Sequence, residues 1–210
     1  MLTSRAISLA RRDCVMEEAI RIGIRLARPE DAPGIAGIYV DSWRDTYAGI
    51  LPAAGLLRMS KTEQSAGWAR TIKSSNLRSP VLVASDAKSN VYGFASAGPS
   101  RDKTLPYEGE VYALYVAPGR TGQGMGTALM SSVFRLFSKS NFNGIVIWAL
   151  AENPSRFFYE AMGGQLIAER HHPMWGQTLR EIGYGWPKLD IAKPRQRVGR
   201  GVDESEPPLG

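Results

Sequence analysis

What the chain lacks sets the first limits on its function. Its 210 residues include a single cysteine, Cys14, which excludes an internal disulfide framework and favours a reducing compartment. The sequence contains no run of eighteen apolar residues, so it predicts no membrane-spanning helix and no membrane partner. The hydrophobic core of a secretory signal is also missing. These absences favour a cytoplasmic protein whose length suits one folded domain.

The formal net charge of +6 is spread over the chain, and part of it lies near the two ends. We expect residues 1–20 to form a flexible N-terminal extension and residues 188–210 a disordered C-terminal tail, with the folded domain between them at 21–187. No nucleic-acid-binding motif occurs, so we do not expect a nucleic-acid partner. A basic nucleic-acid-binding module stays an alternative that steeply salt-dependent binding would reveal.

Three closely spaced glycines are the most informative feature of the sequence. Gly122, Gly124 and Gly126 alternate with other residues between the apolar run 111–116 and a helix-like run that begins near Gly124. Glycine lets backbone N–H groups approach a ligand without an intervening side chain. At the N-terminus of a helix those groups favour an anion, so the pattern predicts a phosphate or pyrophosphate site.

Two common classes of phosphate site do not fit these residues. A P-loop needs Lys followed by Ser or Thr after its last glycine, whereas Gly126 is followed by Thr127-Ala128. A dinucleotide fold needs G-x-G-x-x-G and an acidic residue about twenty positions later. Here the spacing is G-x-G-x-G, and residues 127–151 contain no Asp or Glu. The glycines alone still leave an ordinary glycine-rich turn as an alternative.

The flanking residues carry a more specific signal. The run 110–129, EVYALYVAPGRTGQGMGTAL, resembles motif A of the GNAT (GCN5-related N-acetyltransferase) superfamily. The run 153–164, NPSRFFYEAMGG, is similar to the second signature of that superfamily and follows in the expected order. One position departs from the pattern: Thr121 stands where a basic residue or Gln is usual, and Arg120 lies one place earlier.

Hydrophobic periodicity and capping residues predict the order β-α-α-β-β-β-α-β-α-β-β. Ser60 and Glu63 form a capping box at the second helix, and Asn153 with Pro154 is expected to open the last one. The expected strands are 22–27, 81–84, 91–97, 110–117, 145–150, 165–170 and 179–186; the expected helices begin at 29, 60, 124 and 154. The resemblance implies an α/β, GNAT acyl-CoA N-acyltransferase fold: a central, mostly antiparallel twisted sheet with splayed fourth and fifth strands, flanked by helices.

The resemblance implies acetyl-CoA as the acyl donor and no metal. The strand edge would bind the pantetheine arm, and the glycine turn would cradle the pyrophosphate through its N–H groups. The implied cofactor-binding residues are Leu114, Tyr115, Val116, Arg120, Thr121, Gly122, Gln123, Gly124, Met125, Gly126, Thr127, Asn153 and Tyr159. His171 and His172 lack the partner set of a zinc site and are expected at the surface.

Two residues are candidates for catalysis. Tyr159 matches the general-acid tyrosine of the family, and its alternative interpretation is a core aromatic beside Phe158. Glu110 is the candidate general base; alternatively it is a solvent-facing carboxylate at a strand end, and Glu152 is a weaker candidate base. Trp43 and Tyr47 lie four residues apart, on one face of the first helix, and belong either to the core or to the acceptor pocket.

The function implied is transfer of an acetyl group from acetyl-CoA to a primary amine of a small molecule or peptide. Direct attack in a ternary complex is the expected route. A noncatalytic acyl-CoA sensor or interaction module is the alternative. Dimers are frequent among similar proteins, so a homodimer is compatible with the resemblance, although nothing in the sequence requires one.

Overall fold

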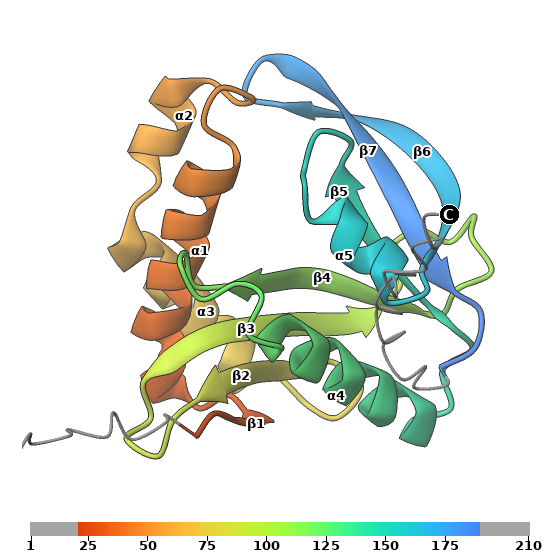
Figure 1. Ribbon diagram of the computed structural model, residues 1–210, viewed down its shortest axis with the longest axis horizontal. Helices are drawn as coiled ribbons and strands as arrows, with labels where there is room; N and C mark the ends of the chain where they lie inside the picture. The colour runs from red at the N-terminus through yellow and green to blue at the C-terminus, as the bar shows by residue number, and fades with distance from the viewer. Residues whose placement is uncertain (1–20, 190–210) are drawn as a thin grey trace, which may run out of the picture.

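The computed structural model describes residues 21–189, so the predictions for residues 1–20, which include Cys14, and for residues 190–210 lie outside the described residues. Seven strands form one sheet in the order β1-β2-β3-β4-β5-β7-β6, as Figure 1 shows. The strands are β1 (Gly23–Leu26), β2 (Val81–Ser85), β3 (Val91–Pro99), β4 (Gly109–Val116), β5 (Ile145–Leu150), β6 (Gln165–Met174) and β7 (Gln177–Trp186). All neighbouring pairs are antiparallel except β4 and β5. This mixed sheet confirms the predicted fold class.

The helices follow the predicted order with one addition. They are α1 (Ala32–Thr46), preceded by a 3-10 turn (Pro29–Asp31), α2 (Ala53–Arg58), α3 (Lys61–Lys73), α4 (Met125–Lys139) and α5 (Arg156–Ala161). The Ser60 hydroxyl accepts a hydrogen bond from the Glu63 N–H at the start of α3, as the capping pattern predicted. Helix α2 was not predicted because six residues after Pro52 are too short to display helical periodicity.

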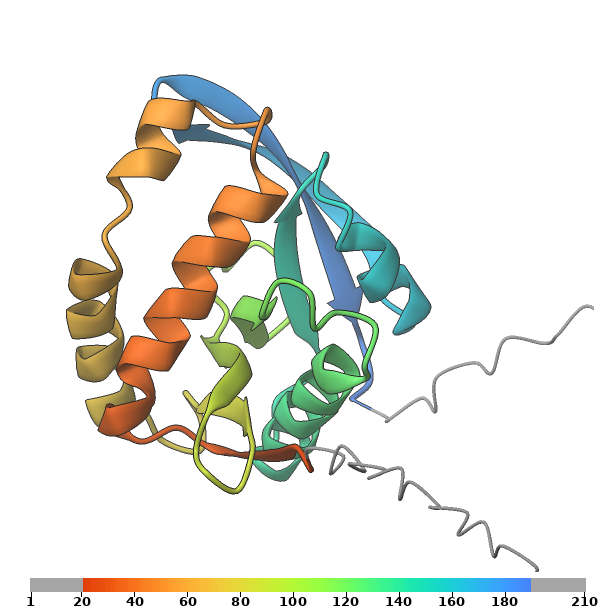
Figure 2. The same ribbon diagram turned by 60° about the vertical axis from the view of Figure 1, so that its left-hand side comes forward.

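Helices cover both faces of the sheet. Helices α1 and α3 lie on one face and α4 lies on the other, which the two views in Figures 1 and 2 show. Phe94, Val83 and Ile35 belong to the core under α1 and α3, whereas Leu129, Val133 and Phe137 belong to the larger core under α4. With both faces covered, the inner strands are largely buried: every residue of β2 is buried, and five of the six in β5 are.

Strands β4 and β5 separate soon after they pair. Their parallel ladder contains only three pairs, from Gly109↔Ile145 to Val111↔Ile147. Strand β3 continues along the other edge of β4 as far as the pair Gly93↔Val116, while β5 pairs with β7 over its whole length. The edge of β4 from Tyr112 to Val116 therefore has no neighbouring strand on the β5 side. An opening in the sheet follows from this divergence.

The β6–β7 hairpin spans this opening and reaches α2, as Figure 2 shows. Its two-residue turn is Trp175-Gly176, and both residues have positive φ, +51° and +80°. Such a turn normally holds Asn-Gly, because a bulky residue at positive φ is strained. The Trp175 ring fits against Gly55 of α2 so closely that a Cβ there would lie 2.3 Å from it. The hairpin tip is therefore attached to α2 by a tryptophan in an unfavourable backbone conformation.

Candidate active site

The divergence of β4 and β5 produces a cleft of about 700 Å³. Its walls come from the free edge of β4, the turn between β4 and α4, the start of α5, the end of α1 and the β6–β7 hairpin. Nearly all of the residues predicted for the site line this cleft: Trp43, Tyr47, Glu110, Leu114, Tyr115, Val116, Thr121, Gly122, Gly124, Gly126, Thr127, Asn153 and Tyr159. Residues more than a hundred positions apart in the sequence thus meet in one cavity.

The glycine turn has the geometry of an anion site. Gly119, Gly122 and Gly124 have φ of +76°, +77° and +81°, values that favour glycine. A Cβ at Gly122 or Gly124 would have no neighbour within 4 Å, so the backbone faces open space. The first helical bond of α4 runs from the Ala128 N–H to the Gly124 carbonyl, and no hydrogen-bond acceptor among the described residues serves the N–H groups of residues 121–127. A row of free donors therefore stands at the positive end of α4.

Three predicted cofactor residues, Arg120, Gln123 and Met125, do not line the cleft. The Arg120 guanidinium lies 5.2 Å from the centre of the Tyr92 ring, on the outside of the turn. Gln123 is exposed, and the Met125 side chain is buried in the core under α4. For Met125, contact with a bound ligand is therefore limited to its backbone. The replacement of a basic residue by Thr121 leaves the turn without a cationic side chain in the cleft.

Tyr159 projects from α5 into the cleft and is 5% exposed. Its hydroxyl makes no hydrogen bond to any of the described residues. Burial, followed by the nearby Tyr47, raises the pKa of Tyr159 well above its ordinary value. The phenol therefore keeps its proton at neutral pH and has a donor available for a ligand. The two interpretations of Tyr159, a general acid and a core aromatic, are compatible, because Tyr159 also packs in the core under α4.

Glu110 is not the solvent-facing carboxylate considered as its alternative, because only 1% of it is exposed. Arg101 donates three hydrogen bonds to the Glu110 carboxylate: its backbone N–H donates to Oε2 at 2.8 Å, Nε donates to Oε1 at 3.0 Å, and Nη2 also donates to Oε1. A carboxylate has about four acceptor positions, so one remains open. The carboxylate in turn raises the pKa of Arg101. Glu152, the weaker candidate base, is exposed and does not line the cleft.

Asn153 connects two walls of the cleft rather than capping a helix. Helix α5 begins at Arg156 with Ser155 as its N-cap, so the prediction that Asn153 is the N-cap and Pro154 the first helical residue is wrong. The Asn153 Oδ1 atom accepts from the Ser155 N–H at 2.8 Å, which closes a local turn, and its Nδ2 donates to the Tyr47 hydroxyl at 2.9 Å. The local turn competes with helical geometry here and delays the helix by two residues.

The aromatic residues of α1 form the opposite wall. The Trp43 Nε1 group donates to the Tyr115 hydroxyl at 2.9 Å, and the Trp43 ring lies 5.0 Å from the Tyr47 ring and 5.8 Å from that of Trp175. Tyr47 is 6% exposed, and burial is the main cause that raises its pKa. Trp43 and Tyr47 therefore belong both to the small core under the hairpin and to the cleft wall.

Sequence reasoning missed the charged residues at this end of the cleft. Arg101 comes from the β3–β4 loop, and Arg170 and Glu181 face each other across the β6–β7 hairpin, with Arg170 Nε 2.7 Å from Glu181 Oε2. A turn centred on Trp175-Gly176 pairs Arg170 with Glu181, so a correct turn assignment could have found this pair. No sequence signal places Arg101 beside Glu110.

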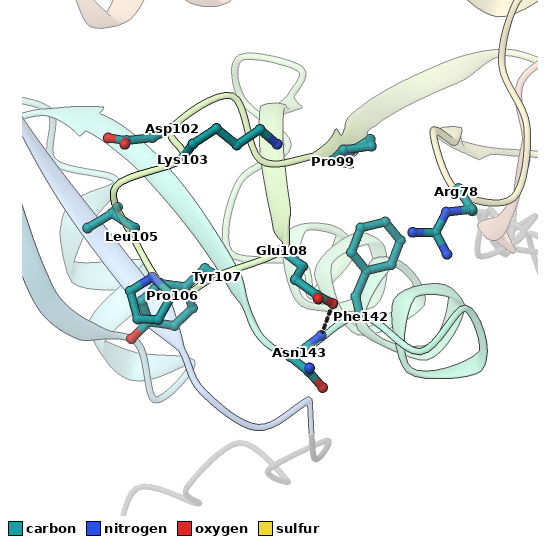
Figure 3. Close-up of a pocket in the computed structure, with 10 residues that line it drawn as sticks. All are labelled: Arg78, Pro99, Asp102, Lys103, Leu105, Pro106, Tyr107, Glu108, Phe142 and Asn143. Atoms are coloured by element: carbon teal, nitrogen blue, oxygen red, sulfur yellow. Dashed lines mark hydrogen bonds between the residues drawn. The ribbon is translucent and has the colours of Figure 1, made fainter.

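Two other features of the described residues do not form competing sites. A shallow hollow of about 480 Å³ lies beside the β3–β4 loop (Figure 3), but its polar groups are engaged locally. The Glu108 carboxylate accepts from the Asn143 N–H, and Arg78 lies over Phe142 and donates to the Ser140 carbonyl. No group of three or more potential metal ligands occurs between residues 21 and 189, where His171 and His172 are exposed on β6.

Comparison with known proteins agrees with this geometry. A model of the acetyltransferase (GNAT) domain matches residues 78–163, which run from just before β2 to the end of α5. The uncharacterized N-acetyltransferase YuaI of Bacillus subtilis (strain 168) is 38% identical over 172 residues, covering 82% of this chain and 96% of the relative. The chain belongs to the GNAT acetyltransferase family. It is therefore an N-acetyltransferase, and most of the residues that line the cleft lie within the matched range.

Solved structures of GNAT proteins share the fold at lower identity. yncA of Salmonella typhimurium, solved with its cofactor acetyl-CoA, has a TM-score of 0.62 at 23% identity and covers 84% of this chain and 99% of its own. The PaiA N-acetyltransferase of Thermoplasma acidophilum, in complex with coenzyme A, has a TM-score of 0.59 at 21% identity, with 78% and 98% covered. The TM-scores show that these proteins share the fold of this chain. In residues 21–189 no helix has the length and apolarity needed to cross a membrane.

Proposed function

We propose that this GNAT protein transfers the acetyl group of acetyl-CoA to the primary amine of a small molecule or peptide by direct attack in a ternary complex. The observation that carries the proposal is the cleft between β4 and β5, which joins a free strand edge to a row of unpaired N–H groups at the start of α4. Extended amide-rich ligands add to strand edges, and pyrophosphates bind helix N-termini. Coenzyme A contains both a pantetheine arm and a pyrophosphate.

The donor would lie along β4 with its pyrophosphate at the glycine turn. The N–H groups of residues 121–127 would bind the phosphate oxygens, and the edge between Leu114 and Val116 would pair with the pantetheine amides. This alignment carries the thioester toward Tyr159 and Asn153, which line the same cleft. A backbone N–H of β4 directed at the thioester carbonyl would stabilise the oxyanion that forms during attack.

The acceptor amine must lose a proton before or during attack. A lysine-like amine with a pKa of about 10.4 costs about 4–5 kcal/mol to deprotonate at pH 7. Glu110 is the proposed base, directly or through a water molecule that uses its remaining acceptor position, because it is the most buried of the carboxylates that line the cleft. Arg101 holds that carboxylate in a single orientation.

The departing thiolate must gain a proton. The neutral amine supplies one proton in excess when it becomes an amide, so the overall transfer is balanced once that proton reaches sulfur. The Tyr159 hydroxyl is the proposed donor, since burial keeps it protonated and no described residue occupies it. Transfer of the phenol proton to sulfur as the C–S bond breaks would leave Tyr159 as a phenolate, which regains a proton from solvent while Glu110 releases to solvent the proton taken from the amine.

Two measurements test the proposal. Release of free CoA thiol from acetyl-CoA is followed with a panel of polyamines, aminoglycosides, amino acids and short peptides, and at least one amine should raise it well above the rate in buffer. Tight acetyl-CoA binding without any such amine would instead indicate the noncatalytic sensor.

The cradle itself is tested by Gly124→Val with Gly163→Val as the matched control. Both glycines have a positive φ, +81° and +83°, with open space around a Cβ, but only Gly124 lines the cleft. Backbone strain of about 1–2 kcal/mol is therefore common to both variants. We expect Gly124→Val alone to weaken CoA binding at least tenfold by calorimetry. Equal affinities in the two variants would refute the pyrophosphate cradle.

A further inference from the structure

Two arginine–carboxylate pairs with the same layout line the cleft. Arg101 pairs with Glu110, and Arg170 pairs with Glu181, and all four residues line the cleft. The carboxylates are the inner members, with side-chain exposures of 1% and 14%, whereas the arginines are the outer members, with 63% and 36%. A ligand that approaches these pairs therefore meets guanidinium groups before it meets carboxylates.

Each guanidinium is held on one side and free on the other. Arg101 uses Nε and Nη2 for Glu110, and its Cζ atom lies 4.5 Å from the centre of the Tyr112 ring. Arg170 uses Nε for Glu181 and lies 4.0 Å from the centre of the Trp148 ring. Within residues 21–189, no hydrogen-bond partner occurs for Nη1 of Arg101 or for either Nη atom of Arg170. Several N–H donors of each guanidinium therefore remain available.

This arrangement suits recognition of an anion. A guanidinium fork donates two parallel hydrogen bonds to a carboxylate or phosphate, and an arginine already fixed by a carboxylate and an aromatic ring loses less freedom on binding. The pair Arg180–Glu169 provides a contrast on the same hairpin. It has similar distances, 3.0 Å from both Nε and Nη2, but both side chains are about half exposed and neither lines the cleft. This surface pair thus lacks the well-covered carboxylate and the aromatic stacking of the arginine that the two cleft pairs share.

We propose that the acetyl acceptor is an amine that also carries an anionic group, a carboxylate in the simplest case, and that Arg101 and Arg170 bind this group. The inference rests on the proposed function and names the substrate class for the same site. Small amino acids satisfy it, since their amine would approach Glu110 and the thioester while the anion stays at the arginines. Polyamines do not satisfy it, because they would bring further positive charge to two guanidinium groups.

The test compares amines that differ only in the anionic group. The pairs are L-lysine with cadaverine, L-phenylalanine with 2-phenylethylamine, and O-phosphoethanolamine with ethanolamine, each assayed for CoA release and amide formation. We expect kcat/KM at least tenfold higher for the anionic member of one or both amino-acid pairs. A preference confined to O-phosphoethanolamine assigns the subsite to phosphate rather than carboxylate. Equal rates, or faster acetylation of the decarboxylated amines, would overturn the inference and leave the proposed function intact.

Variants connect the preference to the arginines. Arg170→Gln and Arg101→Lys should bring the ratio of kcat/KM within each matched pair toward one, because they remove a guanidinium fork. Lysine is used at position 101 because it keeps a cation beside the buried Glu110. Arg180→Gln is the control and should leave the ratio as in the wild type. A ratio that survives both cleft substitutions would refute the role of the arginines, since a general loss of stability lowers both members of a pair together. If no amine in the panel is acetylated, both the inference and the proposed function fail.

Discussion

The contact between Trp175 and Gly55 predicts that Gly55→Ala destabilises the wild-type protein but stabilises a variant that lacks the Trp175 ring. Trp175 is 40% exposed, so about three-fifths of a side chain of roughly 250 Å² is buried. At about 25 cal/mol/Å², the burial of this area stabilises the fold by at most about 4 kcal/mol. Its positive φ costs about 1–2 kcal/mol. The net stabilisation from Trp175 relative to an unstrained turn residue is therefore about 2–3 kcal/mol.

Gly55→Ala should remove most of this stabilisation. An alanine Cβ would lie 2.3, 2.7 and 2.8 Å from three carbon atoms of the Trp175 ring, so the ring must leave its position or α2 must move. We expect a loss of about 2–3 kcal/mol from the free energy of unfolding. In a Trp175→Asn background the same substitution should instead stabilise by about 0.5–1 kcal/mol, because the space is empty and alanine favours a helix more than glycine does.

The assay is urea denaturation followed by far-UV circular dichroism for the wild type, the two single variants and the double variant. The coupling energy between the two positions should be about 3 kcal/mol. Trp175→Asn alone should destabilise the protein by about 2 kcal/mol, although Asn-Gly is the better turn sequence. If Gly55→Ala costs the same in both backgrounds, the ring does not occupy the space beside α2 and the attachment of the hairpin is refuted.

Two further predictions concern catalysis and acid stability. Tyr159→Phe should lower kcat at least tenfold with little change in the dissociation constant of acetyl-CoA, as measured by steady-state kinetics and calorimetry; an unchanged kcat would remove Tyr159 as the proton donor. The Arg25 guanidinium, 2.6 Å from Asp31, lowers the pKa of that buried carboxyl. A lowered folded-state pKa gives stability that is complete above the unfolded value of about 3.9 and is lost as pH falls through the folded value. The free energy of unfolding should therefore drop below about pH 4, and less steeply in Asp31→Asn, while equal slopes in the two proteins would contradict the role of this pair.

Local signals explain why so much of the fold could be predicted from the sequence. The glycine turn and the Ser60 cap of α3 each depend on residues within a few positions of one another. Their geometry is set by backbone sterics and nearby hydrogen bonds, which the sequence displays directly. Helix α2 could not be predicted in this way, because its six residues are too few to display helical periodicity and its contact with Trp175 joins residues 120 positions apart (175 − 55).

The residues of the candidate site that the sequence identified lie in the two family motifs or, for Trp43 and Tyr47, on one face of the first helix. Asn153 was identified as a site residue, but its partner, the Tyr47 hydroxyl, is 106 positions away, and the local pattern favoured a helix cap instead. Arg101 lies in a loop without periodicity, and its place beside Glu110 follows from how β3 and β4 pair. Arg170 and Glu181 meet because of the strained Trp175-Gly176 turn, which has no standard sequence signal. Tertiary packing determines each of these positions.

The cleft exists because the two parts of the sheet are joined at both ends and separated between them. At one end they share the three-pair ladder of β4 and β5, and at the other the β6–β7 hairpin rests on α2 through Trp175. Helix α1 and its C-cap residue Tyr47 add one hydrogen bond to each part of the sheet. Trp43 donates to Tyr115 of β4, and Asn153, which follows β5, donates to the Tyr47 hydroxyl. Arg170 and Glu181 are carried by the hairpin, whereas Glu110 and Arg101 belong to the ladder end. Because Gly55→Ala breaks the contact that holds the hairpin on α2, we expect it to change the separation of the two guanidinium groups and, with it, the size of the proposed anionic acceptor that is acetylated.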